Sequence, residues 1–129
     1  MSTAFLLVAH GSRRTLSNDE VMALTKQLAS RMSECFSSIS CAFLELAEPA
    51  FESALAGLLE QGNTAIVIFP YFLAAGAHVS HDIPTIVSQL QTQYPNCQIT
   101  VLAHLGKQRE LAGLIEQAVL RSSNSHDVA

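Results

Sequence analysis

The sequence predicts an α/β fold, a doubly wound four-stranded parallel sheet flanked by helices. Four short apolar runs occur, at residues 4–9, 41–46, 65–69 and 99–103. Each run precedes a longer segment in which apolar residues recur every three to four positions, as in an amphipathic helix. Strand and helix alternating four times favour parallel strands joined by right-handed crossovers, so we expect the strand order 2-1-3-4.

The helical segments are predicted to bury their apolar stripes in the core. Their starts carry local signals: Ser17 and Glu20 form a capping-box pattern, Pro49 suits a first helical turn, and Asp82 with Pro84 predicts the third start. The stripes are Val21, Leu24, Leu28 and Met32, then Phe51, Leu55, Leu58 and Leu59, then Ile83, Ile86, Val87 and Leu90, and finally Leu111, Leu114, Ile115 and Ala118.

Size and composition favour one compact domain. The chain has 129 residues, of which 49% are hydrophobic, a length at which a single core forms readily. We expect one domain over residues 1–121 and a polar tail over residues 122–129. The net charge is −4 and the seven Lys and Arg residues are scattered, which argues against a nucleic-acid partner.

Cysteine usage and hydropathy point to a cytoplasmic protein. Cys35, Cys41 and Cys97 are odd in number and share no C-x-x-C spacing, as expected for reduced and mostly buried thiols. The apolar run at residues 65–79 is too short and too interrupted for a membrane span, which needs about 20 apolar residues. Residues 4–9 lack the flanks of a secretory signal.

Polar side chains gather where the predicted strands end. His10 follows the first strand, Glu45 ends the second, and the loop leaving the third strand leads to His78. Ligands of doubly wound sheets bind beyond the carboxyl ends of the strands, between the first and third strands in this order. Two imidazoles and a carboxylate are ligands for a first-row divalent metal and bases near neutral pH. Arg13 and Arg14 lie where they could meet an anionic substrate.

Three motifs give this pattern a family resemblance. "LLVAHGSR", "FLELAEPAF" and "PYFLAAGAHVSHDIP", in this order, resemble the class II chelatases, specifically the small CbiX-type sirohydrochlorin chelatases. The similarity runs from Phe5 to about Leu120. It implies a doubly wound fold that corresponds to half of a larger two-lobed chelatase. It also implies a homodimer in which each subunit stands in for one lobe.

The resemblance assigns roles to the residues at the strand ends. It makes His10 and His78 the pair that binds metal and accepts protons, with Glu45 assisting. The implied reaction inserts a divalent metal into sirohydrochlorin, in cobalamin or siroheme biosynthesis. Cobalt is favoured as the metal substrate, iron or nickel come next, and no tightly bound cofactor is expected. Loose nitrogen and oxygen ligands suit this chemistry, because the ion must leave as two pyrrole protons are removed.

The implied macrocycle is flat and carries many carboxylates. Phe72, Leu73 and Val79 are candidate apolar contacts, and Arg13 or Arg14 are candidate carboxylate partners. Phe72 and Leu73 are alternatively anchors of their loop, and the two arginines are alternatively solvated charges.

The remaining histidines receive lesser roles. His81 is expected at a helix start, with a second metal ligand as the alternative. His104, at the end of the fourth strand, is expected to act as a spacer or a supporting group. His126 is expected to be exposed in the tail. Asp82 is expected to cap a helix, and Glu48 is expected at a helix start, where the helix dipole favours a negative charge.

Two other functions compete with metal insertion. One is a non-catalytic carrier of a tetrapyrrole or a metal, which would use the same groove. The other is a histidine phosphatase, because "LVAHG" is similar to the strand-end R-H-G of that class. Ala9 stands where that class has the arginine that grips the phosphoryl group, which counts against the phosphatase.

Overall fold

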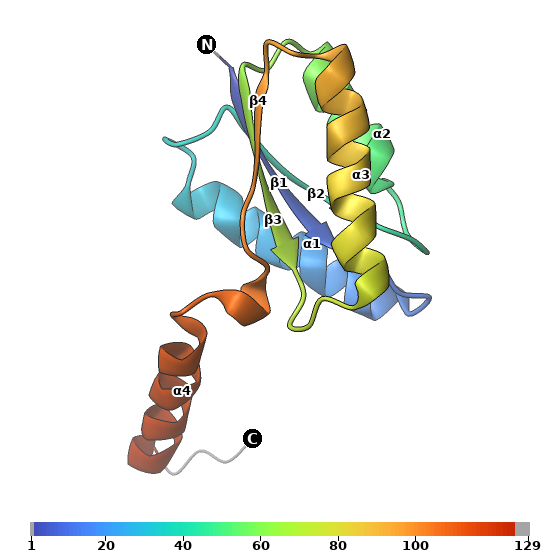
Figure 1. Ribbon diagram of the computed structural model, residues 1–129. Coiled ribbons are helices and arrows are strands. Elements are labelled where there is room, and N and C mark those ends of the chain that lie inside the picture. The colour runs from blue at the N-terminus through green and yellow to red at the C-terminus, as the bar shows by residue number, and fades with distance from the viewer. Residues whose placement is uncertain (1, 126–129) are drawn as a thin grey trace.

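A four-stranded parallel sheet in the order β2-β1-β3-β4 forms the centre of the computed structural model, as predicted (Figure 1). Residues 2–125 are described, apart from the side chains of residues 78, 124 and 125. The elements are β1 (Thr3–Ala9), α1 (Thr15–Arg31), β2 (Ser38–Phe43), α2 (Phe51–Glu60), β3 (Ala65–Tyr71), α3 (Ala77–Gln93), β4 (Gln98–Val101), the 3₁₀ helix η1 (Leu105–Lys107) and α4 (Leu111–Ser125).

The sheet has a different cover on each face (Figure 1). Alternate residues of β1 and β3 pack with α2 and α3 into one apolar cluster, whose members include Leu6, Ile68 and Leu55 at 0% exposure. The other residues of β1 form a second cluster with α1, around Leu7 and Val21. β1 is therefore buried on both faces, which is why it reads as a continuous apolar run.

The strand ends differ from the predicted ones. β2 ends at Phe43 instead of residue 46, so Glu45 lies two residues beyond the strand. β3 continues through Pro70 to Tyr71. A proline is tolerated there because the ladder between β3 and β4 ends at Ile68, and no β4 residue is paired with Pro70.

Three predicted helix starts are wrong. α1 begins at Thr15 and has no side-chain cap, so Ser17 lies inside the helix. α2 begins at Phe51, beyond Pro49. α3 begins at Ala77, which puts Pro84 in its interior. Pro84 removes the helical partner of the Ser80 carbonyl, and both residues are exposed, so the proline need not end the helix.

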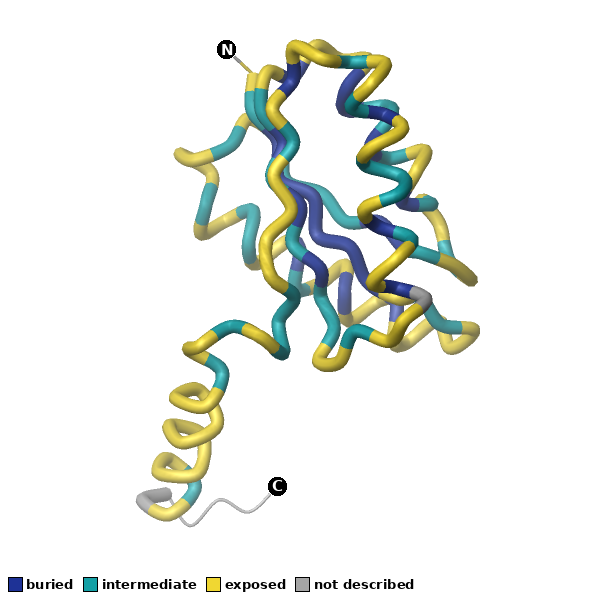
Figure 2. The backbone as a smooth tube through the Cα atoms, in the orientation of Figure 1, coloured by how far each residue is buried: buried dark blue, intermediate teal, exposed yellow. Residues whose placement is uncertain are grey.

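α4 departs from the prediction that every apolar stripe is core. It projects away from the sheet (Figure 1), and nearly all of it is exposed (Figure 2). Leu114 and Ile115 are 59% and 58% exposed. The helix also continues to Ser125, where a polar tail was expected from residue 122. Among the described residues, no helix is long and apolar enough to cross a membrane.

The three cysteines are free thiols in different surroundings. Cys35 is exposed, Cys41 is half-buried and Cys97 is buried. The expectation of mostly buried thiols is thus wrong for Cys35. Burial raises the pKa of the Cys97 thiol, because desolvation disfavours the thiolate.

Candidate functional site

The carboxyl ends of three strands meet at one edge of the sheet. Ala9, the last residue of β1, pairs with Phe43 of β2 and with Tyr71 of β3. His10 follows Ala9 directly, so its side chain leaves the sheet at the centre of this edge. We call it the carboxyl edge. Its position is where the winding of the sheet reverses, as the strand order requires.

His10 and Glu45 lie side by side at the carboxyl edge. The imidazole Nδ1 is 3.7 Å from the carboxylate Oε1, and each side chain is about half exposed. The Glu45 N–H donates to the His10 carbonyl over 3.1 Å, which continues the pairing of β1 and β2 past the ends of the two strands. The side-chain distance is too long for a hydrogen bond, so both groups keep lone pairs for an incoming cation.

Gly11 allows the segments that follow β1 and β2 to approach each other closely. Its φ of +95° lies in the region that favours glycine. A Cβ at this position would be 1.7 Å from the Glu45 carbonyl oxygen. No other residue fits, so the H-G step is a structural requirement of the His10–Glu45 pair.

Asn18 fixes the loop that follows Gly11, a role that the sequence analysis missed. Its side chain accepts the Ser12 N–H over 3.0 Å and donates to the Ser12 carbonyl over 2.8 Å. Asn18 is buried, so these two bonds satisfy an amide that water does not reach. Arg13 and Arg14 are exposed beyond this loop, free to meet an anion. The capping-box pattern around Ser17 concealed this role of Asn18.

The backbone of His78 lies at the start of α3, which follows the carboxyl end of β3. The loop after β3 leads into α3, where His78 is the second residue. Its side chain lies outside the described part of the structure, so the meeting of the two imidazoles stays a prediction. Among the described side chains, no three His, Cys, Asp or Glu residues gather as a metal site. Among the described side chains, the His10–Glu45 pair offers a metal ion one imidazole and one carboxylate.

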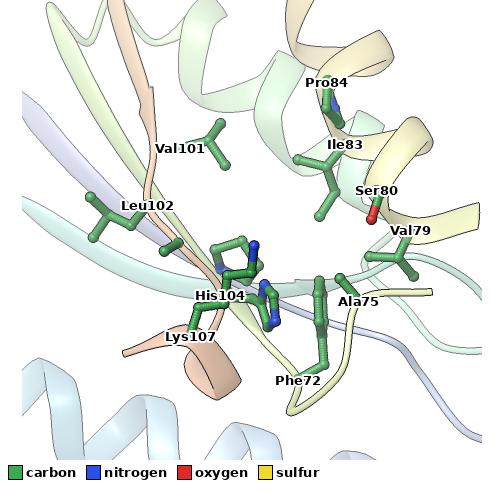
Figure 3. Close-up of a pocket in the computed structure, with 12 residues that line it drawn as sticks. Phe72, Ala75, Val79, Ser80, Ile83, Pro84, Val101, Leu102, His104 and Lys107 are labelled. Carbon is green, nitrogen blue, oxygen red and sulfur yellow. The ribbon is translucent and has the colours of Figure 1, made fainter. Parts of the chain in front are cut away.

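A groove of about 320 Å³ opens between α3 and the segment that follows β4 (Figure 3). Phe72 and His104 stack in it, with ring centroids 5.7 Å apart and planes 24° apart. Val79 is buried and lines it, as does the exposed Lys107. The sequence analysis missed Lys107, since the three-residue η1 helix is too short to show a helical spacing of apolar residues.

The other predicted residues are distributed differently. Leu73 is 67% exposed and does not line the groove. His81 is exposed in the second turn of α3, so the helix-start role is wrong for it. Asp82 also lies inside α3, which excludes capping of its start. His104 comes three residues after β4 ends. His126 lies outside the described residues.

Comparison with known proteins decides the family. A family model described as CbiX matches residues 4–122, nearly the whole chain. The protein belongs to the CbiX family. The resemblance inferred from the three sequence motifs is thereby confirmed.

Relatives of this CbiX chain are named as chelatases of two metals. The sirohydrochlorin ferrochelatase of Bacillus subtilis (strain 168) is 33% identical over 111 residues, which are 86% of the chain and 42% of the relative. The sirohydrochlorin cobaltochelatase of Methanosarcina acetivorans is 35% identical over 83 residues, 64% of the chain and 62% of the relative. The chain thus spans less than two thirds of each relative.

Solved structures agree with the fold and with the difference in length. A cobalamin biosynthesis CbiX protein from Marinobacter aquaeolei VT8 superposes with a TM-score of 0.72 at 26% identity, covering 97% of this chain and 99% of the other. The sirohydrochlorin chelatase SirB from Bacillus subtilis subspecies spizizenii, in complex with cobalt, gives 0.77 at 28% identity, covering 94% and 51%. The chain corresponds to about half of SirB.

Proposed function

We propose that this CbiX protein inserts a divalent metal ion into a sirohydrochlorin-like tetrapyrrole. The observation that carries the proposal is the placement of His10 beside Glu45 at the carboxyl edge, half exposed. Ligands of doubly wound sheets enter at this edge. The names of the relatives support the same substrate class.

The reaction requires an exchange of one cation for two protons. The metal ion forms bonds to the pyrrole nitrogens, and two N–H protons leave, so charge is conserved. In the proposal, His10 and His78 hold the ion and accept protons, and Glu45 supplies negative charge beside His10. A neutral imidazole serves this purpose near neutral pH, because it binds a metal or a proton through the same lone pair.

The groove beside α3 offers apolar contacts for a flat macrocycle. Phe72 and Val79, the apolar contacts that we propose for the macrocycle, line this groove, and His104 adds a second ring. Arg13, Arg14 and the missed Lys107 are the proposed partners of the macrocycle's carboxylates. Leu73 is exposed and does not line the groove, so we propose that it contacts the macrocycle outside the groove.

Cobalt is the metal that we favour, with iron or nickel as alternatives. Imidazole and carboxylate accept all three ions, so the donor set does not select among them. The relatives are named for both iron and cobalt. The corresponding pathways would be cobalamin or siroheme biosynthesis, and we place the activity in the cytoplasm.

We also propose that the working form is a homodimer. The chain covers about half of SirB, and it covers almost all of the Marinobacter CbiX protein. Two copies would supply the second wall of a cleft that one copy lacks.

Insertion rates of Co²⁺, Fe²⁺ and Ni²⁺ into sirohydrochlorin, followed by absorbance, test the proposal. We expect His10→Ala and His78→Ala each to slow every metal by about 100-fold or more, the range for a lost proton acceptor. His81→Ala is the matched control, since His81 is exposed on α3, and it should keep the intact rate. Tetrapyrrole binding without insertion by the intact protein would instead make it a carrier and overturn the proposal.

A further inference from the structure

The segment between β1 and α1 carries residues of the proposed chemistry at both of its ends. It runs from His10 to Arg14 and has neither helical nor strand structure. His10, at its start, lies beside Glu45, and Arg13, near its end, is exposed. The position of His10 therefore depends on the individual hydrogen bonds that hold this segment, which we call the His10 loop.

Hydrogen bonds hold each of the three peptide planes that follow His10. The first plane carries the His10 carbonyl, which accepts the Glu45 N–H over 3.1 Å. The second carries the Ser12 N–H and the third carries the Ser12 carbonyl. Both are bound by the side-chain amide of Asn18, over 3.0 and 2.8 Å. Gly11 lies between the first two planes, so its φ of +95° is fixed from both sides.

Asn18 belongs to the packed part of the fold. It is 8% exposed, and it shares the buried side of α1 with Val21 and Thr25. Val21 packs with Leu7 of β1 in the second apolar cluster. The packing of α1 on the sheet therefore sets the position of the Asn18 amide. Because a buried amide that loses its partners costs free energy, Ser12 is held in one position relative to the sheet.

We propose that Asn18 is a positioning residue for metal insertion, one that holds the His10 loop so that the His10 imidazole stays beside Glu45 at the carboxyl edge. Asn18 is buried and its amide is used by Ser12, so it acts through His10 and does not contact the macrocycle or the ion. A displacement of about 1 Å in a reacting group can cost about 100-fold in rate. The inference rests on the proposed function for the reaction, whereas the placement of His10 can be measured without it.

Asn63 provides a matched control for the loss of a buried amide. It is 7% exposed, and its side chain donates to the Leu58 carbonyl over 2.8 Å. It precedes β3, so it lies at the opposite edge of the sheet from His10. Asn18→Ala and Asn63→Ala thus remove the same group from two similarly buried positions, of which only the first holds the His10 loop.

Insertion of Co²⁺ into sirohydrochlorin is the first test, with circular dichroism to check that each variant is folded. We expect Asn18→Ala to lower kcat by about 10–100-fold. The KM for sirohydrochlorin should stay within about threefold, because an interaction that acts only on the reacting groups leaves KM unchanged. Asn63→Ala should keep both constants. An intact kcat in folded Asn18→Ala, or an equal loss in Asn63→Ala, would overturn the positioning role.

Asn18→Asp is a second variant with a smaller change in shape. It keeps an acceptor for the Ser12 N–H and loses the donor to the Ser12 carbonyl. Its kcat should fall in the same direction as that of Asn18→Ala, with the fold again checked by circular dichroism. An intact kcat would show that the bond to the Ser12 carbonyl does not position His10, and would contradict the proposal.

NMR signals of the histidine rings in the metal-free protein are a test that does not depend on metal insertion. The signal that is missing in His10→Ala identifies His10. Asn18→Ala should shift or split this signal, and Asn63→Ala should leave it in place. An unchanged His10 signal in Asn18→Ala would refute the positioning role. A shifted signal, in a protein whose intact form inserts no metal, would confirm that Asn18 places His10 and would refute the proposed function alone.

Discussion

The candidate site depends on single residues whose backbone conformation or hydrogen bonds no substitute reproduces. His10 and Glu45 lie close because the chain at Gly11 turns with a positive φ against the Glu45 carbonyl. Asn18 then fixes the next residues through Ser12. Sequence inspection places the histidine and the carboxylate at one edge of the sheet. It does not give the backbone hydrogen bond between them, since that bond joins residues 35 positions apart.

We expect Gly11→Ala to lower the free energy of unfolding by at least about 1–3 kcal/mol, because the new Cβ strains the φ and collides with the Glu45 carbonyl. Gly57→Ala, inside α2, meets no atom within 4 Å and should raise it by up to about 1 kcal/mol. Urea unfolding of both variants measures the contrast. An equal or reversed effect would refute the steric account of Gly11.

Asn18→Ala should cost about 1–3 kcal/mol of unfolding free energy, because it leaves the Ser12 N–H and carbonyl without their partner. Asn96→Ala, at an exposed loop position, should stay within about 0.5 kcal/mol of the intact chain. Thermal or urea unfolding checks both values. A neutral Asn18→Ala would show that the loop does not depend on this amide.

Cys35 should react with iodoacetamide faster than Cys97 in the folded protein. The thiolate is the nucleophile, and burial both raises the pKa of Cys97 and blocks access to it. Because its pKa is raised, Cys97 should gain reactivity only above the pH at which an ordinary thiol ionises. Peptide mass spectrometry at several pH values measures this, with urea-unfolded protein as the control in which the difference disappears. Equal native rates would contradict the burial of Cys97.

At the scale of elements, apolar periodicity predicts the inner strands well and the edge strands poorly. β1 and β3 are flanked by strands on both sides, so their apolar runs mark them. β2 is an edge strand that starts with the half-buried Ser38 and Ser40, and its start was therefore missed. The apolar residues Leu44 and Leu46 extended the prediction too far, although Leu46 adopts a positive φ outside the strand.

Helix starts were predicted least well because tertiary contacts override local signals. Asn18 belongs to a capping-box pattern, yet its amide is used by the loop before α1. Pro84 suits a first turn by itself, yet α3 accommodates it at an exposed interior position. For α4, periodicity identified the apolar side correctly, but it contains no information about whether the same chain covers that side.

Leu55→Ala and Leu120→Ala distinguish a core helix from the outer side of α4. Leu55 is 0% exposed in α2, so its truncation should cost about 2–5 kcal/mol. Leu120 is 50% exposed and lies on the opposite side of α4 from Leu114 and Ile115, so its truncation should cost less than about 0.5 kcal/mol. Denaturant unfolding compares the two identical chemical changes. A large cost at Leu120 would show that this side of α4 is also buried.

At the scale of the whole molecule, one copy presents an open edge and not a closed cleft. The family, the strand order and the position of the carboxyl edge were all predictable, since three motifs and the alternation of elements encode them. The groove with His104 and Lys107 was less predictable, because η1 brings these residues together without a periodic signal. The outward course of α4 depends on packing around Gly106, which spacing does not reveal.

The central claim is that the carboxyl edge receives the metal ion. Crystals of the intact protein soaked in Co²⁺ and measured at the cobalt absorption edge locate the ion directly, by anomalous difference density. The account predicts a peak whose nearest side chains are His10, Glu45 and His78. A peak elsewhere on the molecule, with none beside His10, would contradict it.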